Sequence, residues 1–76
     1  MIKVGIYGGS GYTGEELLRL LINHPGANVV VATSRRFAGV PVAEVYPAFA
    51  GLTDLVYTDS SPEAVADLAD IVFMAL

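Results

Sequence analysis

Three glycines with the spacing G-x-G-x-x-G, namely Gly9, Gly11 and Gly14, separate two stretches of contrasting periodicity. The stretch before them, Ile2 to Tyr7, alternates β-branched with other residues, which predicts a strand. The stretch after them, about Tyr12 to Asn23, places leucine and isoleucine at helical spacing and ends near a Pro-Gly pair, which predicts an amphipathic helix. A glycine-rich turn that follows a strand and opens a helix is typical of dinucleotide-binding proteins.

Each glycine of the motif has an expected physical role. Gly9 permits a tight turn, Gly11 lets the backbone approach a pyrophosphate with no Cβ in the way, and Gly14 lets the helix lie close to the strand. The phosphates would then meet free N–H groups and the positive end of the helix dipole, while loop hydroxyls add donors. The ring of Tyr12 could pack against the cofactor, or the glycines could form only a tight turn with nothing bound. The candidate cofactor-binding residues of the loop are Gly9, Ser10, Gly11, Tyr12, Thr13 and Gly14.

The remaining segments extend an α/β pattern. Asn28 to Thr33 contains consecutive valines, typical of a buried parallel strand, and Leu55 to Thr58 and Asp70 to Leu76 predict a third and a fourth strand. A short helix with proline at its first position is expected over Pro41 to Tyr46, and a second main helix after an N-cap at Ser61. About four strands and two to three helices predict the first half of a Rossmann-type, doubly wound parallel sheet in the order 3-2-1-4.

The residues after the second predicted strand bear on which dinucleotide binds. An NAD site usually places an acidic residue there to accept hydrogen bonds from the ribose hydroxyls. Here the sequence reads Thr33-Ser34-Arg35-Arg36, and the next acidic residue is Glu44. Because Ser34 and Arg35 can donate to a 2′-phosphate that a carboxylate would repel, the sequence favours NADP. The alternative is that both arginines are solvated loop residues.

The fourth predicted strand is apolar at every position after Asp70. A buried parallel strand needs partners on both sides and helices on both faces. We therefore expect residues 1–76 to form a partial NADP-binding Rossmann domain, truncated after this strand. An unpaired edge at Ile71 to Leu76 invites pairing with another chain, so a homo-oligomer is expected.

Composition excludes several other classes of protein. The chain has no cysteine and one histidine, which argues against a disulfide framework, a zinc or iron–sulfur site and a cysteine nucleophile. Its net charge of −4 argues against nucleic acid as a partner. The longest apolar run is far shorter than the roughly 20 residues of a membrane-spanning helix, so no membrane association is expected. Without a signal-peptide pattern, the expected location is the cytoplasm.

The other polar residues predict structural roles. His24 stands at a helix end, where a cation complements the dipole, and Asp67 and Asp70 are expected to be solvated or to cap. Neither a catalytic pair nor a metal site is expected. Glu15 stands four residues before Arg19, a helical pair worth about 0.3 kcal/mol.

The tyrosines outside the glycine loop are expected to serve in packing. Tyr7, Tyr46 and Tyr57 are most simply half-buried residues whose hydroxyl groups reach water.

Longer blocks of the sequence resemble a known family. Gly8 to Leu17 is similar to the N-terminal signature of the N-acetyl-gamma-glutamyl-phosphate reductases, NADPH-dependent enzymes of arginine biosynthesis related to aspartate-semialdehyde dehydrogenases. Thr33 to Arg35, Ala38 to Val42, Glu44 to Pro47 and Asp70 to Leu76 are similar to successive blocks of that family. The resemblance covers the whole chain.

The resemblance implies that Ser10 to Gly14 line the cofactor phosphates and that Ser34 and Arg35 hold the 2′-phosphate. In the family, a catalytic cysteine attacks the acyl phosphate to form a thioester, which hydride from NADPH reduces to the semialdehyde with the help of a histidine. This chain has no cysteine, and His24 does not match the catalytic histidine. The resemblance therefore implies a cofactor-binding segment of this oxidoreductase that is not active alone; the alternative is a non-catalytic dinucleotide-binding or self-associating Rossmann fragment.

Overall fold

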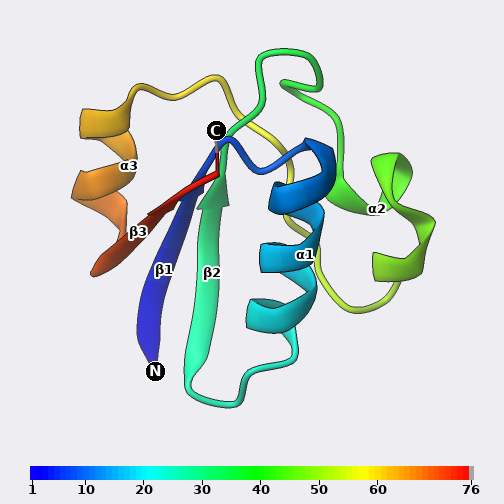
Figure 1. The fold of residues 1–76 in the computed structure, drawn as a ribbon, viewed down its shortest axis with the longest axis horizontal. Coiled ribbons are helices and arrows are strands. Elements are labelled where there is room, and N and C mark those ends of the chain that lie inside the picture. Colours follow the sequence, from blue (N-terminus) through cyan, green and yellow to red (C-terminus); the bar gives the residue numbers. More distant parts are fainter. Residues whose placement is uncertain (76) are drawn as a thin grey trace.

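A parallel sheet with β1 at its centre organises residues 1–75, the part of the chain that the computed structural model describes (Figure 1). The strands are β1 (Ile2–Tyr7), β2 (Ala27–Ala32) and β3 (Ile71–Met74), in the order β2-β1-β3, and both ladders are parallel. Helix α1 (Gly11–Ile22) connects β1 to β2, and helix α3 (Pro62–Leu68) precedes β3. This arrangement confirms the predicted α/β fold of Rossmann type.

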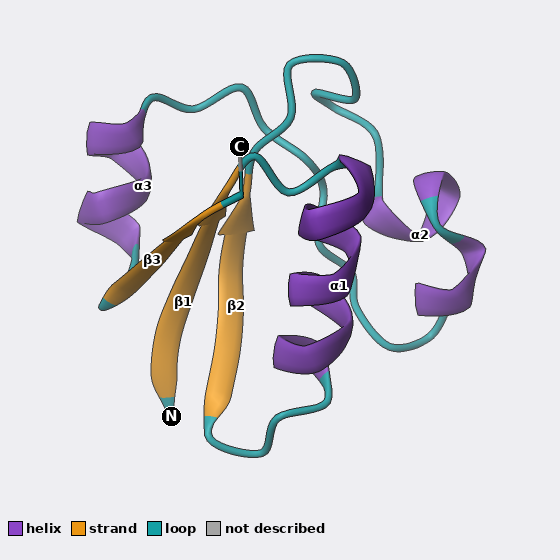
Figure 2. Cartoon of the chain, viewed as in Figure 1, coloured by secondary structure: helices purple, strands orange, loops and turns teal. Residues whose placement is uncertain are grey.

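The two main helices cover opposite faces of the sheet (Figure 2). Ile6 of β1 joins the core cluster that also contains Leu18 of α1, and both side chains are fully buried. Gly5 faces α3, because a Cβ at this position would lie 2.7 Å from Cγ1 of Val65. The alternation along β1 thus supplies a packing surface to each helix.

The predicted third strand is the main departure from expectation. Within residues 1–75, the sheet has three strands, not about four, and Leu55 to Thr58 forms only isolated bridges. Thr58 pairs in parallel with Thr33, whereas Val56 pairs with Pro41 in the antiparallel sense. Since Val56 has a different partner, only one residue of the segment, Thr58, pairs with the residue that follows β2. The segment therefore does not form a continuous strand of the sheet. Its position beside β2 agrees with the predicted lateral order.

The short helices lie between these bridges. The first, α2, spans Val42–Val45 and is followed by a 3-10 turn, η1, over Pro47–Phe49. Pro41 occupies the N-cap of α2, one position before the helical residue at which it was expected. The start of α3 agrees with prediction, since Oγ of Ser61 accepts a hydrogen bond from the amide of Ala64 at 3.2 Å. None of the helices formed by residues 1–75 is long and apolar enough to cross a membrane.

On the outer surface of α1, Arg19 pairs with a different glutamate from the one expected. Its Nη2 lies 2.6 Å from Oε2 of Glu16, three residues before it, and Glu15 is not the partner. Both side chains of the pair are at least half exposed, so the interaction contributes little to stability.

The strand β3 is apolar but largely open. Its exposed fractions are 45% for Ile71, 36% for Phe73 and 56% for Met74, and β1 is its partner on one side. Leu76, the last residue of the predicted fourth strand, lies outside the described residues.

Candidate functional site

A cavity of about 420 Å³ opens at the carboxyl end of the parallel strands, where ligands bind in open α/β sheets. Its walls come from the glycine loop after β1, the residues after β2, and the residues after the bridge at position 58. The lining includes Ser10, Ser34, Arg35, Asp59 and Ser60. The first three of these were predicted from the sequence, and the last two were not.

The glycine loop is tied to the end of β2 by one residue. Gly8 donates its amide hydrogen to Oγ1 of Thr33 at 2.8 Å, and Gly9 donates to the carbonyl oxygen of Thr33 at 2.6 Å. Thr33 is buried, and its bond to the Gly8 amide is part-buried, so water has limited access to this junction. They fix the path of the loop relative to the sheet.

Two tyrosines from the irregular part of the chain hold the same loop. Tyr57 is fully buried, and its hydroxyl donates to the carbonyl of Gly9 at 2.8 Å. Burial raises the pKa of the Tyr57 phenol above its ordinary value, which keeps it a donor. The hydroxyl of Tyr46 accepts from the amide of Gly11 at 2.9 Å and lies 3.4 Å from the Gly11 carbonyl oxygen.

The expectation that the hydroxyl simply reaches water is therefore wrong for Tyr57, and for Tyr46 it omits the bond to the loop. Tyr57 has no exposed surface, and Tyr46 bonds to the loop backbone from a half-buried position. No local sequence pattern could signal these bonds, because they join positions 48 and 35 residues apart.

The hydrogen bonds of the loop leave other amides open. Among residues 1–75, no protein group accepts a hydrogen bond from the N–H of Ser10, Tyr12 or Thr13. Tyr12 and Thr13 lie in the first turn of α1, whose N–H groups have no partner inside the helix and form the positive end of its dipole. Amides of this kind bind phosphate groups.

Some glycines of the loop have different roles in the structure from those expected from the motif. The left-handed conformations belong to Gly8, at φ 86°, and Gly11, at φ 83°, whereas Gly9 does not have a positive φ and is not the turn residue. A Cβ at Gly9 would instead lie 3.0 Å from Cβ of Ala32. Gly14 has the expected position, since a Cβ there would lie 2.5 Å from the carbonyl carbon of Gly9. Only glycine lets α1 approach the loop this closely.

Among the described residues that follow β2, one free cation, Arg35, lines the cavity. Ser34 Oγ lies 2.9 Å from Ser10 Oγ, which joins this wall to the glycine loop, and also accepts from the amide of Phe37 at 3.1 Å. Arg36 lies over the ring of Phe37, 5.1 Å from its centroid. Arg35 is exposed, and no carboxylate in residues 1–75 lies within ion-pair distance of it. Arg35 is thus the arginine available to an anion in the cavity.

The third wall was missed because the chain returns to the site from far along the sequence. Asp59 and Ser60 directly follow Thr58, whose bridge to Thr33 brings them beside the end of β2. The hydroxyl oxygens of Thr58 and Ser60 lie 2.8 Å apart. A one-rung bridge leaves no periodic pattern, so only the structure places this wall.

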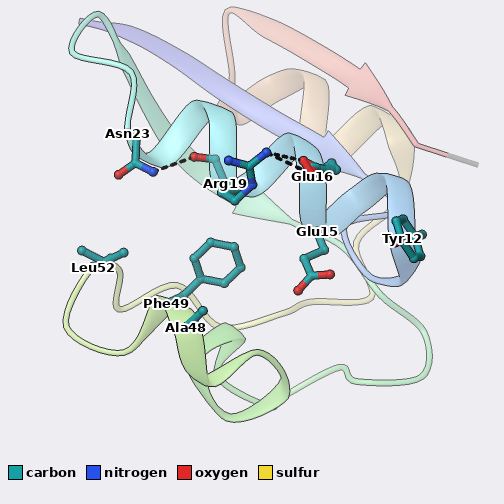
Figure 3. A pocket seen from close by; sticks show the side chains of 8 residues that line it. All are labelled: Tyr12, Glu15, Glu16, Arg19, Asn23, Ala48, Phe49 and Leu52. Carbon is teal, nitrogen blue, oxygen red and sulfur yellow. Dashed lines mark hydrogen bonds and ion pairs between the residues drawn. The ribbon is translucent and has the colours of Figure 1, made fainter.

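A second cavity, of about 480 Å³, lies between α1 and η1 and is not suited to phosphate (Figure 3). Glu15, Glu16 and Arg19 all line it, and because Arg19 pairs with Glu16, the carboxylate of Glu15 is left to repel an anion. The ring of Tyr12 is 89% exposed and borders this cavity, not the one at the strand ends. Tyr12 is therefore not among the residues that line the strand-end cavity.

Two of the other polar residues have structural partners, as expected. Nδ1 of His24 accepts from the amide of Gly26 at 3.0 Å, which stabilises the turn after α1. Oδ2 of Asp70 accepts from the amide of Lys3 at 3.0 Å, at the start of the β1–β3 ladder. Both side chains are thus used within the fold.

A comparison with protein families identifies a match over nearly the whole chain. Residues 3–76 match the family described as semialdehyde dehydrogenase, NAD binding domain. The chain belongs to this family. The match confirms the family resemblance inferred from the glycine block and the later sequence blocks.

Curated relatives of this semialdehyde dehydrogenase domain are reductases of acyl phosphates by name. The N-acetyl-gamma-glutamyl-phosphate reductase of Methanocella arvoryzae is 54% identical over 76 residues, which is 100% of this chain and 23% of the relative. The enzyme of the same name from Methanothrix thermoacetophila is 55% identical over 76 residues, 100% of this chain and 22% of its own length. The LysW-L-2-aminoadipate/LysW-L-glutamate phosphate reductase of Saccharolobus solfataricus is 47% identical over 75 residues, 99% of this chain and 21% of the relative. The chain thus spans less than a quarter of the length of these relatives.

Proposed function

We propose that residues 1–76 bind NADP(H) as part of an acyl-phosphate reductase of the N-acetyl-gamma-glutamyl-phosphate reductase type. The observation that carries the proposal is the cluster of open amides at Ser10, Tyr12 and Thr13, next to a cavity that Ser10 shares with Arg35. Open amides suit a pyrophosphate, and a guanidinium suits a further phosphate. The cofactor would supply hydride to the acyl group. The chain's own residues would bind and orient it.

Support for NADP over NAD comes from the end of β2. Ser34 and Arg35 border the cavity there, and Arg35 forms no ion pair in the described part of the chain. A bidentate guanidinium matches a phosphate group, whereas a ribose 2′-hydroxyl offers it a weaker partner.

The cofactor preference is tested by Arg35→Ala in the full-length protein that carries this sequence. We expect the substitution to weaken NADPH binding about tenfold or more beyond its effect on NADH, since a charge-assisted hydrogen bond contributes about 1.5–3 kcal/mol. Calorimetric titration with both cofactors measures the difference. Arg36→Ala is the matched control, because Arg36 stacks on Phe37 and should change neither affinity. Equal losses for NADPH and NADH after Arg35→Ala would remove the 2′-phosphate role.

The substrate proposal rests on the relatives. Two of them are named as N-acetyl-gamma-glutamyl-phosphate reductases, and we propose the same reaction here: reduction of an acyl phosphate to N-acetyl-glutamate semialdehyde for arginine synthesis, in the cytoplasm. The full-length protein should form the semialdehyde from N-acetyl-glutamyl phosphate and NADPH. Activity restricted to an acyl phosphate carried on LysW would instead align it with the Saccharolobus relative.

The open edge of β3 supports a second proposal, self-association of the chain. Ile71 and Phe73 are exposed on one face of this strand, where they line a mostly apolar hollow of about 130 Å³ with Ile2, Val4 and Leu21. An apolar edge strand with one partner is a template for pairing with another copy.

We expect the 76-residue chain to form dimers or larger species as its concentration rises, as measured by sedimentation. Phe73→Lys should shift the population towards monomer, because a charge on the edge disfavours pairing. Leu20→Lys, at an exposed position of α1, is the control and should leave association unchanged. A folded chain that stays monomeric at high concentration would contradict this proposal.

A further inference from the structure

The three walls of the strand-end cavity stand in a fixed lateral order. β1 leads into the glycine loop, its neighbour β2 leads to Ser34 and Arg35, and the single bridge of Thr58 lies on the far side of β2. Asp59 and Ser60 therefore line the cavity at the wall farthest from the glycine loop. Adjacent strands are about 4.8 Å apart, so the third wall lies roughly 10 Å from the first.

The adenosine half of a dinucleotide has its groups in the same order. Pyrophosphate, ribose and base are linked in succession, and the proposed function assigns the pyrophosphate to the glycine loop and the 2′-phosphate to Arg35. The base is then the group that reaches the third wall. We infer that Asp59 is a specificity-determining residue that accepts a hydrogen bond from the exocyclic amine of adenine. The inference rests on the proposed function for the placement of the pyrophosphate.

The chemistry of the third wall is complementary to the edge of adenine. An ionised carboxylate is an acceptor only, and adenine presents an amine donor at its 6-position. Asp59 is exposed and has no cationic partner within ion-pair distance among residues 1–75, so its oxygens are available to a ligand. The hydroxyl of Ser60, held near that of Thr58, can donate to the neighbouring ring nitrogen.

This geometry also opposes two alternative partners for Asp59. Hypoxanthine has a carbonyl oxygen in place of the amine, and a carboxylate would repel that oxygen. The ribose 2′-position is the other alternative, but a 2′-phosphate held by Arg35 would itself repel the Asp59 carboxylate. Of the groups in NADP, the adenine amine is the donor that Asp59 suits best.

The test compares NADPH with its hypoxanthine counterpart, deamino-NADPH, by calorimetric titration of the full-length protein. We expect the unsubstituted protein to bind NADPH about tenfold or more tightly, the discrimination of one well-placed base contact. Asp59→Asn should reduce this preference to about threefold or less, because an amide can accept from adenine or donate to hypoxanthine. Asp54→Asn is the matched control: Asp54 is an exposed carboxylate outside the cavity lining, and its replacement should keep the full preference.

Four results would overturn the inference, and they differ in what else they affect. Equal binding of NADPH and deamino-NADPH by the unsubstituted protein would show that the adenine amine is not recognised. An unchanged preference for NADPH over deamino-NADPH after Asp59→Asn would show that Asp59 does not recognise it. Both results leave the proposed function intact. If Asp59→Asn changed the ratio of the NADPH and NADH affinities but left the preference for NADPH over deamino-NADPH unchanged, Asp59 would be assigned to the ribose instead. Failure of the unsubstituted protein to bind any of the cofactors removes the proposed function and this inference with it.

Discussion

Replacing Gly14 with alanine is expected to destabilise the fold by about 3 kcal/mol or more, the upper part of the range for overpacked interiors. The added Cβ would lie 2.5 Å from the carbonyl carbon of Gly9 and 2.8 Å from the carbonyl oxygen of Gly8. Both neighbours are backbone atoms of a loop already fixed by Thr33 and Tyr57, so they cannot move aside cheaply. Alanine raises helix propensity by only about 1 kcal/mol over glycine, which is too little to offset the clash.

Denaturant unfolding of the full-length protein and its variant measures this effect. Gly26→Ala is the control, because a Cβ there would meet only the side chain of His24, at 3.2 Å or more, without a positive φ. We expect the midpoint of Gly26→Ala to stay close to that of the unsubstituted protein. If Gly14→Ala were as stable as Gly26→Ala, close contact between α1 and the loop would not be the reason for glycine at position 14.

The parts of the fold that the sequence predicts well are those whose information is local. β1, the glycine loop and α1 follow from alternation, glycine spacing and helical periodicity within the first 23 residues, and the structure has all three. The N-cap at Ser61 is equally local and equally well predicted. Each of these features depends on residues that are close neighbours along the chain.

The segment from Leu55 to Ser60 resisted prediction because its structure depends on distant partners. Leu55 to Thr58 has the composition of a strand, yet its residues divide their bridges between Thr33 and Pro41 and form no ladder. The same segment supplies Asp59 to the cavity and the hydroxyl of Tyr57 to the glycine loop. Such long-range contacts have no periodic signature in one sequence.

These contacts between distant parts of the chain hold the glycine loop of the candidate site in one conformation. Thr33, Tyr46 and Tyr57 use the hydrogen-bonding groups of Gly8, Gly9 and Gly11, and they leave the next amides along the chain open. A loop fixed in this way presents its remaining donors to a ligand without a further ordering cost on binding. The irregular segment is therefore part of the site and not merely a connection between strands.

Replacing Gly11 with alanine is expected to weaken the binding of NADPH and NADH alike, by roughly 30-fold to 100-fold. A Cβ at Gly11 would meet nothing within 4 Å in the protein, so the space above it is available to the pyrophosphate that both cofactors share. Loss of one hydrogen bond to a charged group, at about 1.5–3 kcal/mol, sets the size of the effect. Arg35→Ala, in contrast, should separate the two cofactors.

The control for Gly11→Ala is Gly39→Ala, which matches it in backbone φ and in the open space at the Cβ position. Gly39 has φ 85° against 83° for Gly11, and a Cβ at either residue would meet nothing within 4 Å. Both variants should therefore lose a similar stability, about 1–2 kcal/mol for alanine in a left-handed conformation. Calorimetry on the folded full-length variants should then show weakened binding for Gly11→Ala alone. If Gly11→Ala bound NADPH as tightly as Gly39→Ala does, the pyrophosphate would not lie over the start of α1, and the proposed cofactor site would have to be abandoned.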